Sequence, residues 1–380
     1  MAPIDVTGLR QPLPDASHAP GALYASPEFY RLDVEKLFMR DWLFVGRVEE
    51  LPDPGDYLTM RIAGEPIIVA RTPAGELAAY YNMCLHRGVE VAEGCGNTAA
   101  FKCPYHGWIY DLSGRLTGAA YMKESKGFEL GEQRMRPLRL ETWRRNIFVA
   151  FDRAAPPLHE FVAELEQDFA FLRMEDCRLG NRIVLDLECN WKFVHENLMD
   201  FYHVGVLHAK TFGARFSWTD DNVHLKPGGG ISIFYAAGPP TPGAEPLLGK
   251  MPWLEDRPVS FACTGFLGPN CTLFGRIDCV RFMVGWPDGP GRSRTIIYQL
   301  FPEAFFDRPG FRETLKVYHE YQLQILEEDR SMIESMQRAM ASPAYRPGRM
   351  STQEKPLHHY LNGYLARVLA AGPDARERQP

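Results

Sequence analysis

Two short segments of the sequence carry paired cysteine and histidine residues. The first is CLHRG at 84–88, and the second is CPYHGW at 103–108. Together they offer two thiolates and two imidazoles, which is a complete set of four metal ligands: Cys84, His86, Cys103 and His106. Gly88 and Gly107 follow the two pairs, at points where the backbone must bend closely around a bound object. The chemistry that these residue types and spacings suggest is metal binding on two tight loops.

Two kinds of metal centre accept this ligand set. Zinc takes two cysteines and two histidines in one tetrahedral site, but zinc fingers usually place like ligands together, as C-x2-4-C followed by H-x3-5-H. A Rieske [2Fe–2S] cluster takes two cysteines on one iron and two histidines on the other. Here each segment supplies one cysteine and one histidine, and the flanking residues are strand-like and aromatic. The mixed order therefore favours a Rieske cluster over zinc.

The sequence CLHRG…CPYHGWIYD resembles the Rieske domain of the Rieske non-haem iron aromatic ring-hydroxylating oxygenases, in their large (alpha) subunit. It is less similar to the respiratory-complex Rieske proteins, whose loops carry an additional disulfide, because Val89 and Tyr105 occupy the matching positions. The resemblance implies that Cys84 and Cys103 bind one iron, while His86 and His106 bind the other. It also implies that Arg87 and Trp108 pack over the cluster.

A second candidate metal site lies in NWKFVHENLMDFYHVGVLHAK, residues 190–210. Asp200 and His203 are three residues apart and would share one face of a helix. His208 follows five residues after His203, about 140° around an unbroken helix, and Gly205 between them can relax that geometry. Both histidines can then reach one metal, with Asp200 beside them. The D-x2-H-x4-H spacing matches the mononuclear iron motif of the same oxygenase family.

Non-haem Fe(II) sites that activate oxygen commonly use two histidines and one carboxylate, which leaves positions open. The helical pattern at 310–341 offers such a carboxylate, because Asp329 lies on an apolar stripe with Leu326, Ile333, Met336 and Met340. A buried carboxylate is costly unless it is paired or bound to metal. Glu328 lies at the edge of the stripe and is the second choice. The family places its last ligand in such an acidic helix, so we predict His203, His208 and Asp329 as iron ligands.

Asp200 then needs a different role. The resemblance implies a bridging acid for electron transfer, which hydrogen-bonds a histidine of this iron site and a cluster histidine, such as His106, of a neighbouring subunit. A carboxylate in this position fixes the orientation and basicity of the imidazole. The family arrangement is a head-to-tail homotrimer, and the resemblance leaves an additional beta subunit open.

The chain as a whole reads as an α+β protein, with 45% hydrophobic and 24% charged residues. Residues 1–40 form a helical segment that we expect to pack on the catalytic domain. Short strands over 41–153 predict a small all-β Rieske domain. Residues 154–380 predict a mononuclear-iron catalytic domain of the helix-grip (START-like) type, with an antiparallel sheet and a long C-terminal helix. His358 and His359 fall in a polar tail, where we expect them to be solvated.

Composition also argues against several classes of partner. The formal net charge of -6 gives no basic footprint for nucleic acid. We find neither a signal peptide nor an apolar run of membrane-spanning length, so we expect a cytoplasmic protein without membrane contact. Neither a Rossmann fingerprint nor a plant-type ferredoxin motif occurs. Electrons should therefore reach the protein from a separate reductase, with or without a ferredoxin, and ultimately from NAD(P)H.

The expected function is that of a terminal oxygenase, which uses O2 to hydroxylate a small aromatic or other apolar substrate, as in aromatic hydrocarbon catabolism, by ring dihydroxylation or monooxygenation. Candidate pocket residues are Phe212, Phe216, Trp218, Phe234, Tyr235, Phe266, Phe274, Phe282 and Trp286. One residue fewer separates Asn197 from Asp200 than in naphthalene-type enzymes, which resembles the branch of choline- and betaine-type monooxygenases. A monooxygenase or demethylase of O-methyl, N-methyl or quaternary-amine substrates is therefore the alternative. The non-enzyme alternatives are a Rieske electron carrier and a ligand-binding sensor.

Overall fold

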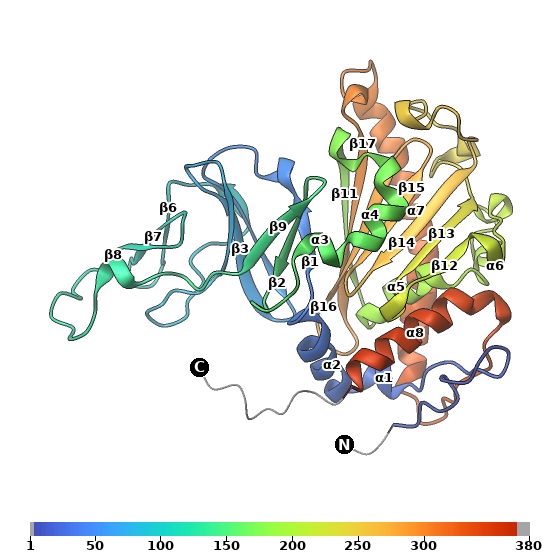
Figure 1. Ribbon diagram of the computed structural model, residues 1–380, viewed down its shortest axis with the longest axis horizontal. Coiled ribbons are helices and arrows are strands. Elements are labelled where there is room, and N and C mark those ends of the chain that lie inside the picture. The colour runs from blue at the N-terminus through green and yellow to red at the C-terminus, as the bar shows by residue number, and fades with distance from the viewer. Residues whose placement is uncertain (1–3, 371–380) are drawn as a thin grey trace. The chain divides into compact units, whose positions relative to one another are not determined.

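The computed structural model describes residues 4–370, which fold as two compact units (Figure 1). The small unit is the continuous segment Phe38–Val162. The large unit combines the N-terminal residues up to Leu37 with the chain from Ala163 onward. The small unit is thus an insertion between two parts of the large one. None of the helices within residues 4–370 has the length and apolar character needed to cross a lipid bilayer.

The small unit consists almost entirely of short antiparallel strands in three sheets, with orders β1-β10-β9, β4-β3-β2-β5 and β6-β7-β8. Its strands are β1 (Leu43–Arg47), β2 (Asp56–Ile62), β3 (Glu65–Arg71), β4 (Leu77–Tyr81), β5 (Cys95–Asn97), β6 (Ala100–Lys102), β7 (Ile109–Asp111), β8 (Leu116–Gly118), β9 (Arg139–Trp143) and β10 (Asn146–Ala150), followed by the short helix α3 (Leu158–Phe161). The fully buried Ile68 and Tyr110 belong to a core cluster that also contains Cys84, Cys103 and Trp108. The two candidate cluster loops are therefore attached directly to a packed core.

The large unit is built on a seven-stranded antiparallel sheet with the order β11-β17-β16-β15-β14-β13-β12. Its strands are β11 (Cys177–Leu187), β12 (Val223–Leu225), β13 (Ile231–Ala236), β14 (Phe261–Leu267), β15 (Cys271–Arg276), β16 (Val280–Pro287) and β17 (Ser293–Pro302). Its helices are α1 (Ala22–Ala25), α2 (Pro27–Asp33), α4 (Ala163–Phe169), α5 (Trp191–Met199), α6 (Val204–Leu207), α7 (Phe311–Met340) and α8 (Lys355–Val368). The α+β class with a long C-terminal helix, which the sequence predicted, is confirmed.

Helices cover both faces of this sheet. A Cβ atom on Gly265 of β14 would meet Phe169 of α4, which places α4 against one face. On the opposite face, Thr272 of β15 contacts His195 of α5, and Phe301 of β17 packs against Tyr318 of α7 with ring centroids 5.1 Å apart. Because side chains alternate along a strand, this second face also carries the even-numbered residues of β15 and the odd-numbered residues of β16. The space between that face and α7 becomes important below.

A buried ion pair attaches the N-terminal helices to helix α5. Asp33 and Lys192 are both 0% exposed, and the Lys192 ammonium lies against the Asp33 carboxylate. Trp191 Nε1 donates to Asp33 at 3.0 Å, and the Tyr364 hydroxyl of α8 donates to it at 2.6 Å. Three donors therefore compensate one buried carboxylate, as its removal from water requires. The N-terminal segment is part of the scaffold that positions α5.

Two local expectations were wrong. Asp200 and His203 do not share one helix, because α5 ends at Met199 and the next helical turn, α6, starts at Val204. The Asp200 carboxylate accepts a hydrogen bond from the backbone N–H of Tyr202 at 2.8 Å, a local turn that competes with the helix.

His358 and His359 are not free in solvent either. They lie on α8 and hydrogen-bond to backbone carbonyls, including that of Lys226.

Candidate metal centres

The two cysteine–histidine loops of the small unit have the same backbone geometry. In the first loop, Cys84 N–H donates to the carbonyl of Val89, and Gly88 N–H donates to Cys84, both at 2.8 Å. In the second, Cys103 N–H donates to Trp108 at 2.8 Å, and Gly107 N–H donates to Cys103 at 3.0 Å. Both glycines have positive φ, 77° and 72°, a conformation that favours glycine. Equivalent loops present equivalent ligands, although one loop has an additional residue between cysteine and histidine.

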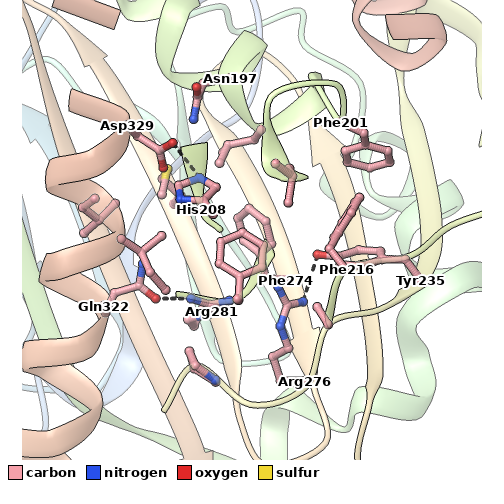
Figure 2. Close-up of a pocket in the computed structure, with 18 of the residues that line it drawn as sticks. Asn197, Phe201, His208, Phe216, Tyr235, Phe274, Arg276, Arg281, Gln322 and Asp329 are labelled. Carbon is pink, nitrogen blue, oxygen red and sulfur yellow. Dashed lines mark hydrogen bonds and ion pairs between the residues drawn. The ribbon is translucent and has the colours of Figure 1, made fainter. Parts of the chain in front are cut away.

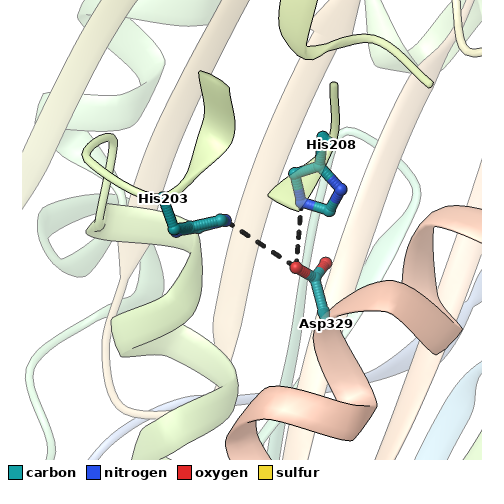
Figure 3. Close-up of side chains that lie close together, drawn as sticks. All are labelled: His203, His208 and Asp329. Atoms are coloured by element: carbon teal, nitrogen blue, oxygen red, sulfur yellow. Dashed lines mark ion pairs between the residues drawn. The ribbon is translucent and has the colours of Figure 1, made fainter. Parts of the chain in front are cut away.

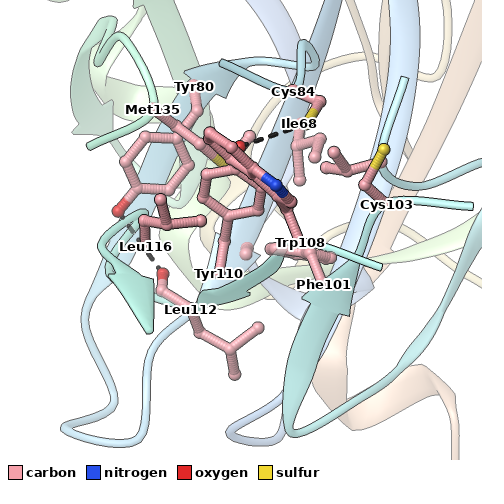
Figure 4. Close-up of a cluster of buried hydrophobic side chains, with 12 residues drawn as sticks. Ile68, Tyr80, Cys84, Phe101, Cys103, Trp108, Tyr110, Leu112, Leu116 and Met135 are labelled. Atoms are coloured by element: carbon pink, nitrogen blue, oxygen red, sulfur yellow. Dashed lines mark hydrogen bonds between the residues drawn. The ribbon is translucent and has the colours of Figure 1, made fainter. Parts of the chain in front are cut away.

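The four predicted ligands lie at the tips of these loops, thiols inside and imidazoles outside. Cys84 and Cys103 are 3% and 2% exposed and belong to the hydrophobic core shown in Figure 4. His86 and His106 are exposed, and their Nδ1 atoms are 3.1 Å apart. Two buried soft sulfur donors beside two exposed nitrogen donors fit a cluster that has cysteine ligands on one iron and histidine ligands on the other.

Aromatic residues support these loops. The indole of Trp108 stacks on the His86 ring, with centroids 4.9 Å apart and planes inclined by 12°. The Tyr110 hydroxyl lies 3.2 Å from Cys84 Sγ and accepts a hydrogen bond from Leu85 N–H at 2.9 Å. Trp108 therefore contacts a predicted ligand. Arg87 is exposed beside the ring of Tyr105.

In the large unit, the structure brings together the three residues predicted for the mononuclear site (Figure 3). One donor atom from each of His203, His208 and Asp329 lies within 4.8 Å of the others. Asp329 Oδ1 is 2.9 Å from His208 Nε2 and 3.7 Å from His203 Nε2. This buried oxygen makes no hydrogen bond of good geometry within residues 4–370. An orphaned carboxylate oxygen facing two imidazole nitrogens fits the donor set of a non-haem iron site.

Each histidine of this trio also faces a second carboxylate with its other ring nitrogen. His203 Nδ1 lies 3.2 Å from Asp200, and His208 Nδ1 lies 2.7 Å from Glu328 Oε2. Thr211 donates to the same Glu328 oxygen at 2.9 Å. The hydrogen bond to Glu328 fixes the tautomer of His208 and leaves its Nε2 free as a metal ligand, whereas Asp200 contacts His203 Nδ1 without a hydrogen bond of good geometry within residues 4–370. The sequence offered Glu328 only as a substitute ligand. In the structure its carboxylate contacts the outer nitrogen of His208 and does not face the space between the two histidines and Asp329.

The protonation of His208 is set by its acidic neighbours. Burial alone would lower the pKa of His208, but its close contact with Asp329, its hydrogen bond to Glu328 and the negative charges of both raise it overall. Because a metal binds the neutral imidazole, it must displace a proton from this group. Metal affinity at this site should consequently weaken as the pH falls.

The trio forms part of the wall of a cavity of about 800 Å³ that is partly open to solvent (Figure 2). Most of its wall is apolar. Apart from the two histidines, its aromatic residues are Phe201, Phe212, Phe216, Tyr235 and Phe274. Four of these were among the nine aromatic candidates from the sequence. Phe266, Phe282 and Trp286 are instead buried elsewhere in the unit. A mostly apolar wall with a few polar groups suits a small organic molecule.

Two arginines, Arg276 and Arg281, also line the cavity, and sequence reasoning missed them. A signal was present in CVRFMVGW, residues 279–286, where a single charge interrupts an otherwise apolar strand. Such a charge is either at a strand edge facing water or buried for a reason. Here Arg281 lies at an inward position and is 7% exposed.

Comparison with known proteins identifies both units. Residues 174–370 match the family model of the ring hydroxylating alpha subunit (catalytic domain), and residues 41–134 match that of the Rieske [2Fe-2S] domain. Choline monooxygenase of Beta vulgaris is 27% identical over 356 residues, covering 92% of this chain and 76% of its own. The carnitine monooxygenase oxygenase subunit of Acinetobacter pittii is 28% identical, covering 88% and 89% respectively.

A solved structure shares the complete fold. The crystal structure of the quaternary ammonium Rieske monooxygenase CntA in complex with L-carnitine aligns with a TM-score of 0.78 at 23% identity. The alignment covers 97% of this chain and 99% of that one. The two family matches identify the protein's cofactors as a Rieske [2Fe–2S] cluster and a mononuclear iron. The chain belongs to the ring-hydroxylating alpha-subunit family and is a Rieske oxygenase.

Proposed function

We propose that this oxygenase inserts one oxygen atom into a C–H bond of a small N-methylated or quaternary amine. The reaction consumes one O2, two electrons and two protons, and converts C–H into C–OH with release of one water. The electrons come from a separate reductase, since the relatives in Acinetobacter and elsewhere are themselves named oxygenase subunits. When bound, the mononuclear iron supplies the site of oxygen activation.

The observation that carries this proposal is the trio His203, His208 and Asp329 in the wall of a partly open, mostly apolar cavity. An electron carrier or a ligand sensor needs no such donor set at its binding cavity. Choline and carnitine, the substrates in the names of the relatives, share a trimethylammonium group. Aromatic rings such as Phe201 and Phe216, whose centroids lie 5.2 Å apart, can accommodate such a cation on their faces.

The relatives support this one-atom reaction better than ring dihydroxylation. Aromatic hydrocarbon catabolism, the main expectation from the sequence, finds no support among them and is not retained. The sequence feature that points to the branch proposed here is the short spacing between Asn197 and Asp200.

Within this proposal, the four loop residues hold the cluster and the trio holds the iron. Asp200 orients His203 through its Nδ1 atom and serves as the bridging acid toward a cluster histidine of a neighbouring subunit. The apolar walls exclude water while the substrate is oxidised. The oxygenase works as a head-to-tail homotrimer with a reductase, with or without a ferredoxin.

The test is product analysis with a surrogate reductase, NADH and ¹⁸O2 on a panel of quaternary amines, N-methyl amines and aromatic hydrocarbons. We expect one ¹⁸O atom per turnover, either in a hydroxylated amine or in the aldehyde that it releases, trapped before exchange with water, and no dihydrodiol from any hydrocarbon. A cis-dihydrodiol carrying two labelled atoms as the main product would overturn the proposal.

Metal analysis gives a second check. The oxygenase should contain about three irons per chain, two in the cluster and one mononuclear, whereas an electron carrier should contain about two. Asp329→Ala should lower the iron content by about one and abolish oxygenation, while the visible spectrum of the cluster persists.

A further inference from the structure

The cavity has a positively charged region below His208 and Asp329 in the view of Figure 2. Arg276 of β15 and Arg281 of β16 are 5% and 7% exposed. Strand pairing places Phe274 directly opposite Arg281, and alternation along β15 puts Arg276 on the same face. Both guanidiniums lie over the ring of Phe274, at 5.9 Å and 5.3 Å from its centroid. Two cationic groups therefore share one small region of the cavity.

Neither guanidinium has a carboxylate partner within 4 Å in the described part of the chain, residues 4–370. Arg276 Nη1 donates to the Tyr235 hydroxyl at 2.9 Å and to the Gly275 carbonyl at 3.2 Å. Arg281 Nη1 donates to the side-chain oxygen of Gln322 on α7. All three acceptors are neutral, and Arg281 Nε is buried with no partner in that same part of the chain.

A neighbouring acid, Asp278, acts only at a distance. It is fully buried and accepts a hydrogen bond from the Tyr318 hydroxyl. Burial raises the pKa of Asp278 to about 6, and within residues 4–370 it forms no ion pair with either guanidinium. Burial and the charge of Arg276 lower the pKa of Arg281 to about 10, which still leaves Arg281 protonated at neutral pH. Two buried cations of this kind are costly unless an anion joins them.

We propose that Arg276 and Arg281 form a carboxylate-binding subsite, so that the substrate of this oxygenase is a small amine that also carries a carboxylate. The inference rests on the proposed function and specifies its substrate class. Arginine is the side chain best suited to planar, paired hydrogen bonding of carboxylates. A cationic amine without an acid group would be repelled by this region, whereas a zwitterion places its negative end there.

The position of this subsite relative to the metal trio sets the substrate's orientation. Gln322, which holds Arg281, and Asp329 lie seven residues apart on α7, a rise of about 10 Å along the helix. The carboxylate would therefore be anchored at one end while a carbon several bonds away faces His203, His208 and Asp329. Phe201 and Phe216 lie across the cavity from Asp329 and are available to the ammonium group, whereas the Tyr235 ring already faces the Arg276 guanidinium at 5.1 Å (Figure 2).

Direct binding to the purified, iron-loaded oxygenase tests the subsite. Dissociation constants for glycine betaine, L-carnitine, L-carnitine methyl ester and choline are measured by titration calorimetry. We expect at least one free acid to bind about tenfold or more tightly than the ester or choline, the scale of one charged hydrogen bond. Arg281→Gln and Arg276→Gln should each remove most of that preference, and Arg281→Lys should retain part of it.

Arg294→Gln is the matched control, because Arg294 lies on β17 of the same sheet but is exposed and paired with Asp186 at 2.6 Å. It should bind like the wild type, and the cluster spectrum and iron content should be unchanged in every variant used. Equal affinity of the wild type for acid and ester overturns the subsite. So does the absence of binding by every acid at millimolar concentration, or an equal loss of acid and ester binding in Arg281→Gln.

Adding benzoate to this panel, together with the ¹⁸O2 product assay, separates this inference from the proposed function. Arginine-dependent binding and hydroxylation of a carboxylate without an amine, such as benzoate, would leave the subsite in place and refute amine oxidation. Conversely, arginine-independent oxidation of choline and the ester would support amine oxidation and refute the subsite.

Discussion

Glu328 is placed to support the proposed iron ligand His208 from behind. Its carboxylate holds His208 Nδ1 at 2.7 Å and is itself held by Thr211. We expect Glu328→Gln to weaken iron binding about 10- to 100-fold, as losses of such supporting contacts do. Iron retention during dialysis against a chelator measures this effect.

The neighbouring residue provides a control for that experiment. Glu327 is 55% exposed and pairs with Arg330, away from the histidines. Glu327→Gln should retain iron like the wild type. Equal iron loss in both variants would show that the helix, not the contact with His208, was affected.

Glu196 makes the stability of the large unit depend on pH. It is 7% exposed and accepts a hydrogen bond from the Tyr24 hydroxyl at 2.9 Å, and burial raises its pKa from 4.5 to about 7. The folded protein therefore binds more protons than the unfolded chain between these two values, so this residue lowers stability as pH rises from about 4.5 to 7. Glu196→Gln should remove this fall in stability with rising pH. Tm values for both proteins should converge near pH 5 and diverge at pH 8, and parallel curves would contradict the assignment.

Local motifs explain which site residues the sequence revealed. The four cluster candidates are close in sequence, and so are His203 and His208, so their spacing alone was informative. Asp329 is more than a hundred residues away and was found because an acid on an apolar stripe needs a partner. Arg276 and Arg281 escaped notice because their shared face depends on strand register, which the sequence does not specify.

At the scale of elements, the break between α5 and α6 positions the iron site. An unbroken helix would hold His203 and His208 about 140° apart. Instead, Asp200 ends α5, and both rings converge on α7. The sequence suggested that Gly205 would relax the helix, but Gly205 lies within α6. The helix is instead interrupted at Asp200, whose side chain accepts a hydrogen bond from Tyr202 N–H. Helix α8 was also overlooked, although Leu357, Leu361 and Leu365 repeat at helical spacing.

Asp200→Asn tests the electron-transfer role without removing the turn. The amide oxygen can still accept the hydrogen bond from Tyr202 N–H, but the negative charge beside His203 is lost. We expect both metal centres to remain and oxidation of the reduced cluster in a single turnover to slow about tenfold or more. Rapid mixing with O2 and substrate, followed at the cluster's visible absorption, gives the rate. Oxidation at the wild-type rate would exclude the role.

The ion pair of Asp33 and Lys192 is the element-scale contact most sensitive to mutation. Lys192→Met leaves the Asp33 carboxylate buried without its cation, which should cost about 3–5 kcal/mol. The double variant with Asp33→Asn should recover much of this loss. Thermal unfolding of the large unit measures both, with the exposed Lys210→Met as control. If Lys192→Met were as stable as Lys210→Met, the ion pair would not contribute to the stability of the large unit.

At the scale of the whole molecule, the proposed trimer can be tested by combining two inactive chains. His106→Ala should lose the normal cluster, and Asp329→Ala should lose the mononuclear iron. If electrons pass between subunits, co-expression of the two variants should restore part of the activity that neither has alone. Activity of the co-purified mixture, with differently tagged chains, checks this expectation. No recovery in verified mixed trimers would place electron transfer within one chain.

The insertion of the small unit into the large one has a consequence for biosynthesis. By the time the ribosome has translated residue 162, the small unit is complete, but the large unit has only its first 37 residues. The partners of Asp33 are synthesised later: first Trp191 and Lys192, and last Tyr364. Domains generally fold as units during synthesis, so the iron–sulfur centre can be assembled on a nascent chain. The oxygen-activating centre, whose Asp329 emerges much later, must be the last to form.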